Sequence, residues 1–365
     1  MNISEVIQTL EAYAPLSYQE SYDNAGLITG YAGWPCTGIL CSLDATEDVV
    51  NEAVQNGCNF IVAHHPIIFG GLKKITGRNY VERTIIAAIK NNVAIYAIHT
   101  NLDNVYNGVS LRMAETLGLQ HCRVLEPKTG LLKKMYTYVP FDDAEKVRAA
   151  LFIAGAGNIG NYDECSFNAE GVGTYKPLEN TNPYIGEWGK RAETTEIKIE
   201  VIFPAYRQSQ IVAALLSAHP YEEVAYDIIS LANDYMQVGS GIIGELQQET
   251  DEESFLRHLQ HTFHLSVIKH TKLLQRNVKK IALCGGSGFF LLKRAIAKNA
   301  DVYITSDIKY HEFFDAEGSL LLADIGHWES EQFTIDLLHD ILRVKFHSFA
   351  VLKTKVRTNP VNYFL

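Results

Sequence analysis

Three short segments of the sequence combine histidine with other side chains that ligate metal ions. They are AHHP at 63–66, HTNLD at 99–103 and HWESE at 327–331. Imidazole nitrogens and carboxylate oxygens together favour zinc, iron, manganese or cobalt over calcium, and they make a thiolate site unnecessary. The candidate ligands in these segments are His64, His65, Asp103, His327 and Glu331. Their types predict a site for divalent metal ions.

Each segment has a plainer interpretation when it is taken alone. The histidine pair could be two polar loop residues, and HTNLD could be a turn or a helix cap, since Asn and Asp commonly fill those roles. HWESE could be an exposed first helical turn, where Glu is favourable near the positive end of the helix dipole. In a helix, however, His327 and Glu331 would share one face, because they stand at positions i and i+4.

The number of donors indicates more than one ion. Five ligands are many for a single ion that keeps an open position, but they suffice for two ions if Glu331 or Asp103 bridges them. Two divalent ions about 3.5–4 Å apart can activate a water and stabilise an oxyanion. We therefore expect two divalent metal ions, with zinc as the first expectation and iron or manganese as alternatives.

Two further segments could line the same site. GGSG at 285–288 could hold an anion with its backbone amides, although a tight turn is the plainer interpretation, and it matches neither a P-loop nor a dinucleotide fingerprint. SDIKYH at 306–311 contains His311, a candidate general acid or base, and Lys309, a candidate phosphate contact. An ordinary surface loop is an equally reasonable interpretation of SDIKYH.

All of these segments directly follow predicted strands. Apolar runs typical of buried strands lie at 38–43, 60–63, 93–98, 280–284, 302–305, 320–325 and 346–352. Helical patterns alternate with them at 4–13, 45–55, 80–91, 108–117, 289–298 and 328–344. This alternation predicts an α/β core with a mainly parallel sheet and packed helices. Such a sheet would place the three metal-ligating segments on one rim, at the carboxyl ends of its strands.

The pattern changes between residues 126 and 237. Strands at 132–139, 195–203 and 224–229 and helices at 143–152 and 207–218 surround a glycine-rich stretch at 155–189. Two strand–helix units of this kind predict a small α+β domain of the ferredoxin-like type. We therefore expect 126–237 to be inserted into a discontinuous metal-binding core made of 1–125 and 238–365.

The composition and charge of the chain favour some classes of protein and disfavour others. The chain has 365 residues, 47% of them hydrophobic and 20% charged, which is typical of a globular protein with a sizeable core. Its formal net charge of −10 makes nucleic-acid binding an unfavoured function, because such binding needs basic groups to neutralise phosphates. Six cysteines without CxxC spacing indicate a reducing compartment, and no secretory leader or apolar membrane span is apparent. We expect a cytoplasmic protein.

The motifs resemble those of the GTP cyclohydrolase 1 type 2 homologue family, also called the Ngg-interacting-factor-three-like proteins. The matching motifs are DNAGL at 23–27, AHHP at 63–66, HTNLD at 99–103, CGGSG at 284–288, SDIKYH at 306–311 and GHWESE at 326–331. The middle of the chain resembles the insert of the longer bacterial members, through GNIGNYDECSF at 157–167, EGVGTYKP at 170–177 and HPYEE at 219–223.

The resemblance implies a dinuclear metal site with the five ligands named above, and His99 as a further ligand or as a partner that orients one. It also implies a homohexameric toroid whose openings the insert caps. The first expected function is a metal-dependent hydrolase acting on a nucleotide-like or other small phosphorylated substrate, with His311 and Glu331 as candidate catalytic residues. The alternative is a non-catalytic metal-binding regulatory protein whose insert recognises a partner or an effector.

Overall fold

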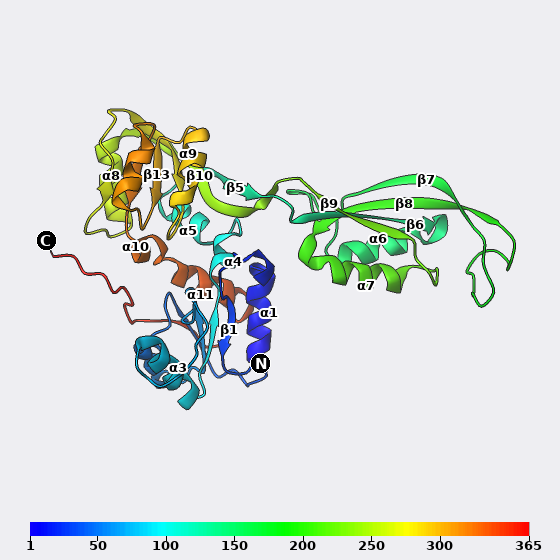
Figure 1. Ribbon diagram of the computed structural model, residues 1–365, viewed down its shortest axis with the longest axis horizontal. Coiled ribbons are helices and arrows are strands. Elements are labelled where there is room, and N and C mark those ends of the chain that lie inside the picture. Colours follow the sequence, from blue (N-terminus) through cyan, green and yellow to red (C-terminus); the bar gives the residue numbers. More distant parts are fainter. Residues whose placement is uncertain (365) are drawn as a thin grey trace. The chain divides into compact units, whose positions relative to one another are not determined.

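The structure is a computed structural model that describes residues 1–364. The chain folds into two compact units (Figure 1). Residues 1–126 and the chain from residue 237 onward form the first, which we call the discontinuous unit. Pro127–Met236 form the second, which we call the central unit. The fold is mixed α/β, and each unit has its own sheets, so each is described by itself.

The first sheet of the discontinuous unit has the strand order β1–β4–β3–β2–β15. Its strands are β1 (Gly26–Thr29), β2 (Ile39–Ser42), β3 (Phe60–Ala63), β4 (Ala94–Ala97) and β15 (Val351–Lys353). Neighbouring strands are parallel except that β1 is antiparallel to β4. Strands β2, β3 and β4 are buried along their whole length, which explains their continuous apolar sequences.

Helices cover both faces of this sheet. Apolar residues of α1 (Ile3–Tyr13) and α11 (Thr334–Lys345) pack on one face, and those of α2 (Glu47–Gln55) and α3 (Tyr80–Lys90) pack on the other. Side-chain caps mark where α2 and α3 begin. Thr46 Oγ1 accepts a hydrogen bond from the backbone N–H of Val49 at 3.3 Å, and Asn79 Oδ1 accepts one from Glu82 at 2.8 Å. The short segment η1 (Leu16–Tyr18) follows α1.

The second sheet of this unit has the order β11–β14–β13–β12–β10–β5. Its strands are β5 (Gln120–Lys128), β10 (Tyr235–Asp251), β11 (Lys269–His270), β12 (Asn277–Leu283), β13 (Val302–Thr305) and β14 (Leu321–Asp324). Strands β12, β13 and β14 are parallel, whereas β10 and β11 pair with them in the antiparallel direction. Apolar residues of α5 (Val109–Thr116) and α8 (Glu252–Thr262) cover one face, and those of α9 (Leu292–Ala297) the other.

The structure differs from the sequence-based expectations in the organisation of the sheets and in the bounds of three elements. The parallel strands belong to two sheets rather than one, because alternation along the chain does not specify which strands share hydrogen bonds. The long helix expected at 328–344 is instead α10 (His327–Glu331) followed by α11, and the helix expected at 289–298 begins as the 3-10 turn η4 (Phe289–Leu291). The final strand is shorter than expected, since β15 covers 351–353.

The central unit has the element order β6–α6–β7–β8–α7–β9. Its elements are β6 (Leu132–Pro140), η2 (Phe141–Asp143), α6 (Ala144–Ile153), β7 (Ser166–Tyr175), β8 (Ala192–Pro204), η3 (Ala205–Arg207), α7 (Gln208–Ala218) and β9 (Tyr226–Leu231). The sheet order is β7–β8–β6–β9, and these pairs are antiparallel. Helices α6 and α7 lie on one face of the sheet and enclose an apolar core (Figure 1). Strand β7 was not expected, because its sequence is glycine-rich and polar.

Two further features are the state of the cysteines and the length of the helices. All six cysteines are free, with no disulfide among them. Across residues 1–364, no helix has the length and apolar character needed to cross a membrane.

Candidate metal centre

The carboxyl ends of strands from both sheets supply the predicted ligands. His64 and His65 follow β3, and His99 follows β4 as the N-cap of α4 (Thr100–Asp103). In the second sheet, β14 ends at Asp324 and α10 begins at His327. The chain turns between them at Gly326, whose φ of 89° suits glycine. The expectation of a single sheet rim is therefore wrong, because the site lies where the strand ends of two sheets meet.

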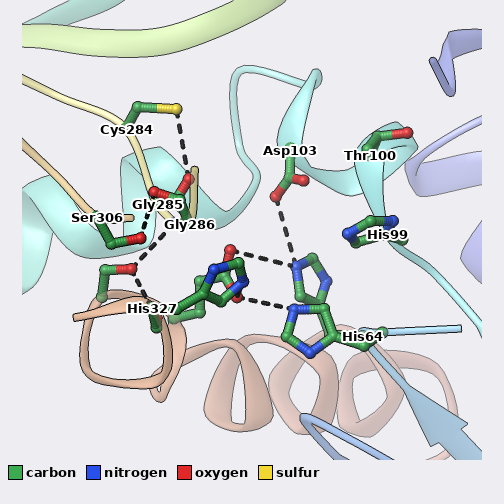
Figure 2. Close-up of polar contacts among 12 residues, drawn as sticks. His64, His99, Thr100, Asp103, Cys284, Gly285, Gly286, Ser306 and His327 are labelled. Atoms are coloured by element: carbon green, nitrogen blue, oxygen red, sulfur yellow. Dashed lines mark hydrogen bonds and ion pairs between the residues drawn. The ribbon is translucent and has the colours of Figure 1, made fainter. Parts of the chain in front are cut away.

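The structure brings all five predicted ligands together, and His99 with them. The ring centroids of His64 and His65 are 4.9 Å apart, and those of His64 and His99 are 5.2 Å apart. Glu331 Oε2 lies 2.9 Å from His65 Nε2 and 3.2 Å from His327 Nε2. Figure 2 shows His64 and Asp103 facing each other, with His99 on one side and His327 on the other.

Three overlapping groups in this cluster could each hold a metal ion. Within each group the potential ligand atoms lie within 4.8 Å of one another. The groups are His64 with His65 and His99, His65 with His327 and Glu331, and His64 with Asp103 and Glu331. Because His64, His65 and Glu331 each belong to two groups, the geometry suits neighbouring positions that share ligands.

Each site histidine has its Nδ1 atom held by an oxygen of the protein. Nδ1 of His64 lies 2.8 Å from the carbonyl oxygen of Ile98. The other three pairs join His65 to Asp44 at 2.8 Å, His99 to Asp23 at 2.8 Å and His327 to Asp307 at 2.5 Å. Such an oxygen accepts the Nδ1 proton, orients the ring and leaves Nε2 as the metal-binding nitrogen. All four rings therefore present Nε2 to the cluster.

Three of these rings are held by aspartates, which were not predicted as site residues. Signals for them existed in the sequence. Asp23 lies in DNAGL and Asp307 in SDIKYH, two of the family motifs. Asp44 comes just after the end of β2, at the same edge of the sheet as His64. The strand-end argument that identified the histidines applies equally to Asp44.

Two buried polar atoms test whether the cluster fits a cation. His64 Nε2 and Asp103 Oδ1 are buried and make no hydrogen bond with any described residue. They lie 3.6 Å apart, and His64 itself is fully buried. A buried polar atom without a partner is costly, and a divalent ion bound between these atoms would satisfy both. The donor set of imidazole nitrogens and carboxylate oxygens agrees with this fit.

Protonation in the cluster follows burial and the nearby carboxylates. Burial lowers the pKa of His64 to about 3, so its ring is neutral. Burial and the charge of Glu331 raise the pKa of Asp103 to about 7. For His65, burial opposes protonation, but the hydrogen bonds to Asp44 and Glu331 outweigh it and raise its pKa to about 10. Protons on imidazole therefore compete with metal ions for this site.

The pKa values of Glu331 and His327 are shifted by burial and by the contacts that these two residues make. Burial alone would raise the pKa of Glu331, but hydrogen bonds from His327 and His65 hold it well below its usual range. Burial likewise opposes the charge on His327, whose pKa is nevertheless raised to about 11 by its contacts with Asp307 and Glu331. The carboxylate of Glu331 is thus ionised and ready to bind a cation.

The glycine-rich turn at 285–288 has a steric role at the site. A Cβ atom on Gly286 would lie 2.2 Å from Glu331 Oε1, and the φ of this residue is +61°. Its backbone N–H donates to Ser330 Oγ, and that of Gly288 donates to Thr305 Oγ1. These two amides are therefore occupied within the protein and do not form the anion cradle considered from the sequence.

His311 lies outside the cluster. It is exposed in η5 (Tyr310–Ala316), where its ring contacts those of Tyr310 and Phe314. Among residues 1–364, no hydrogen bond, ion pair or ring contact joins it to the site histidines. Lys309 is also exposed and lies 3.7 Å from Glu312. The geometry therefore gives neither residue a part in the metal centre.

Comparisons with known proteins agree with these motifs. A sequence model of the family described as Duf34/NIF3 (NGG1p interacting factor 3) matches residues 1–360. A protein of Halalkalibacterium halodurans named GTP cyclohydrolase 1 type 2 homolog is 38% identical over 367 residues, covering 99% of each chain. A Bacillus subtilis protein of the same name is 37% identical over 330 residues, covering 90% of this chain and 88% of its own.

Solved structures agree as well. A crystal structure of a Bacillus cereus protein related to NIF3 superposes with a TM-score of 0.89 at 37% identity, covering 100% of this chain and 99% of that one. A Staphylococcus aureus protein superposes with a TM-score of 0.79 at 28% identity and the same coverage.

Proposed function

This chain belongs to the DUF34/NIF3 family, and from that premise we propose that it binds two divalent metal ions and uses them for hydrolysis. The observation that carries the proposal is the common orientation of the four site histidines. Each has Nδ1 held by an oxygen and directs Nε2 at a cluster that contains Asp103 and Glu331. His64, His65, His99, His327 and the two carboxylates would hold the ions, with zinc as the first expectation and iron or manganese as alternatives.

The ions would supply Lewis acidity, which activates a water and stabilises negative charge on a reacting oxygen. The chain's own residues prepare that chemistry. Asp23, Asp44 and Asp307 orient three imidazole rings, while Glu331 stays ionised and is shared between two groups of ligands. Burial of His64 and of Glu331 restricts water around them, which strengthens their electrostatic interactions.

We propose a nucleotide-like or other small phosphorylated substrate. Divalent ions bind phosphate oxygens well, and relatives of this chain are named GTP cyclohydrolase 1 type 2 homolog. Phe69 adds support for a planar ring in the substrate. Its side chain is 55% exposed and stands edge-on to His99, with ring centroids 5.5 Å apart. An exposed ring beside the metal ligands offers an apolar surface for stacking.

We also propose that the central unit is the ferredoxin-like insert expected from the sequence. Its element order and antiparallel strand order support that assignment.

The test combines metal content with turnover. Purified chain loaded with zinc or manganese should hydrolyse at least one of a panel made of GTP, ATP, nucleoside monophosphates and sugar phosphates. The substitution Glu331→Gln should lower turnover at least about hundredfold, because it removes a shared metal ligand. Glu329→Gln is the matched control. Glu329 is buried in the same helix, but its carboxylate accepts a hydrogen bond from Asn359 at 2.9 Å.

The outcomes separate the proposed hydrolase from the alternative function. Turnover that survives Glu331→Gln would contradict hydrolysis at this site. Metal that binds in the expected amount while no compound of the panel is hydrolysed would favour the non-catalytic metal-binding protein instead.

A further inference from the structure

The central unit has a cavity of its own, with a volume of about 860 Å³. Strands β7 and β8, the segment 176–184 and the segment 221–225 form its walls. Sites for small molecules usually measure about 300–1,000 Å³, so the volume suits such a ligand. On β8 the residues Ile197, Ile199 and Val201 pack in the core with α6 and α7. Alternate residues Glu196 and Lys198 line the cavity instead.

Tyrosine rings form much of the cavity wall. The ring of Tyr221 lies 5.9 Å from that of Tyr175 and 6.2 Å from that of Tyr184, measured between centroids. Hydrogen bonds hold two of these rings in place. The hydroxyl of Tyr175 donates to the carbonyl oxygen of Ile185 at 2.9 Å, and that of Tyr221 donates to Glu196 Oε1 at 2.8 Å. The electron-rich faces of preoriented aromatic rings attract cations.

The charged residues of the wall are mostly acidic. Lys176 and Lys198 are its basic residues, and Nζ of Lys198 already lies 2.5 Å from Glu200, which is outside the cavity wall. The acidic residues are Glu170, Glu179, Glu196, Glu222 and Glu223. This excess of carboxylates would repel phosphate groups, so the ligand class differs from the substrate proposed for the metal centre.

Glu196 is the buried acidic group of the wall. Only 8% of its surface is exposed. Among the described residues, Tyr221 alone donates a hydrogen bond to its carboxylate. Its other oxygen, Oε2, lies against Gly173, where a Cβ atom would come within 2.1 Å of it. A buried carboxylate without a cationic partner pays a desolvation cost that a positively charged ligand would offset.

We propose that this cavity binds a small organic cation carrying an alkylammonium or guanidinium group. The cationic group would pair with Glu196, and the rings of Tyr175, Tyr184 and Tyr221 would enclose the carbon skeleton. The residues of this site all belong to the central unit, so none of them is a candidate ligand of the metal centre.

Calorimetric titration of the full chain tests the proposal. The probes are choline, agmatine and spermidine, with AMP as an anionic comparison. At least one of the three cations should bind, and an excess of AMP, which as a nucleotide is a candidate ligand of the metal centre, should leave that cation's binding unchanged. Glu196→Gln should weaken binding of that cation at least about tenfold, because it removes a charge-assisted hydrogen bond. Glu193→Gln is the matched control, since Glu193 is an exposed residue of β8 outside the cavity wall.

A second pair of variants keeps the test decisive if Glu196→Gln does not fold. Tyr184→Ala removes a ring that is 57% exposed, so the core should be unaffected while cation binding weakens. Gly173→Ala should displace the Glu196 carboxylate and weaken binding in the same way. The proposal is overturned if none of the three cations binds, if AMP displaces the bound cation, or if folded variants bind the cation as tightly as the original chain.

Discussion

The site histidines differ from a structural histidine in the use of their second ring nitrogen. In the central unit, His219 Nε2 donates to the carbonyl oxygen of Tyr138, and its Nδ1 accepts from the backbone N–H of Tyr221. Both nitrogens of His219 are thus satisfied within the protein. His64, by contrast, has Nδ1 bonded to Ile98 while its buried Nε2 has no hydrogen-bond partner among the described residues. That asymmetry distinguishes a metal ligand from a core histidine better than burial does.

Gly286 illustrates how one residue without a side chain supports the site. We predict that Gly286→Ala lowers the metal content per chain, because the new methyl group would lie 2.2 Å from Oε1 of Glu331 and displace that carboxylate. It should also destabilise the fold by about 1–2 kcal/mol, since an L-residue would adopt a left-handed conformation. Elemental analysis and thermal denaturation measure the two effects. Gly71→Ala is the control, because no atom lies within 4 Å of the added group. Unchanged metal content in Gly286→Ala would contradict this role.

The ligands follow the ends of strands, and hydrogen bonds hold the loops beside them in place. Before α3, the loop 76–79 is held by Glu82, a buried residue in the first turn of that helix. Its Oε2 accepts hydrogen bonds from the backbone N–H of Thr76 at 2.8 Å and of Arg78 at 3.1 Å. These backbone hydrogen bonds lower the pKa of Glu82 to about 2. One carboxylate therefore joins the end of the loop that follows His65 to the beginning of a helix.

This shift predicts how stability depends on pH. The pKa of Glu82 is lower in the folded protein than its ordinary value of 4.5, so its contribution is fully present above pH 4.5. The contribution is lost as the pH falls toward about 2. We therefore expect Glu82→Gln to lower the melting temperature clearly at pH 7 and less at pH 3. A difference that stays constant between these pH values would contradict the argument.

The matched control for Glu82→Gln contacts the same helix. Glu47 forms an exposed ion pair with Arg83 of α3 at 3.3 Å. Exposed pairs of this kind contribute little to stability, so Glu47→Gln should change the free energy of unfolding by less than about 1 kcal/mol.

The central unit has a complete apolar core of its own. Fully buried residues of α6 and α7, including Val147, Leu151, Ile211 and Leu215, pack against Ile199 and its neighbours on β8. A unit with its own core is expected to fold independently. The homohexamer implied by the family resemblance concerns the assembly of whole chains and stays a prediction, which mass measurement under native conditions checks.

We predict that a fragment comprising residues 127–236 folds by itself and unfolds cooperatively in urea, as followed by circular dichroism. Within that fragment, Leu215→Ala should cost about 2–5 kcal/mol, because it opens a cavity in the core. Its neighbour Leu216 is 50% exposed, so Leu216→Ala should change stability by no more than about 0.5 kcal/mol. A fragment without a cooperative transition would show that its core needs the rest of the chain.

The local sequence was sufficient to predict the strands and ligands whose burial or chemistry leaves a pattern in consecutive residues. The mainly apolar runs of β3 and β13 were predicted with the observed bounds, since strands buried on both faces are rich in apolar residues. Strand β7 was missed because most of its residues are exposed and several are glycine or polar, so nothing in its pattern has the period of a strand. The candidate ligands were found because each lies in a short segment that follows an apolar strand.

Only the tertiary structure brings those ligands close together. Hydrogen bonding between strands distant in sequence divides the parallel strands into two sheets, and no local pattern records that division. The supporting aspartates are likewise recognisable only in three dimensions, because Asp23 holds His99 and Asp44 holds His65 across long separations in the chain. Residue types and spacing thus specified which side chains could bind metal, whereas packing specified which of their atoms face one another.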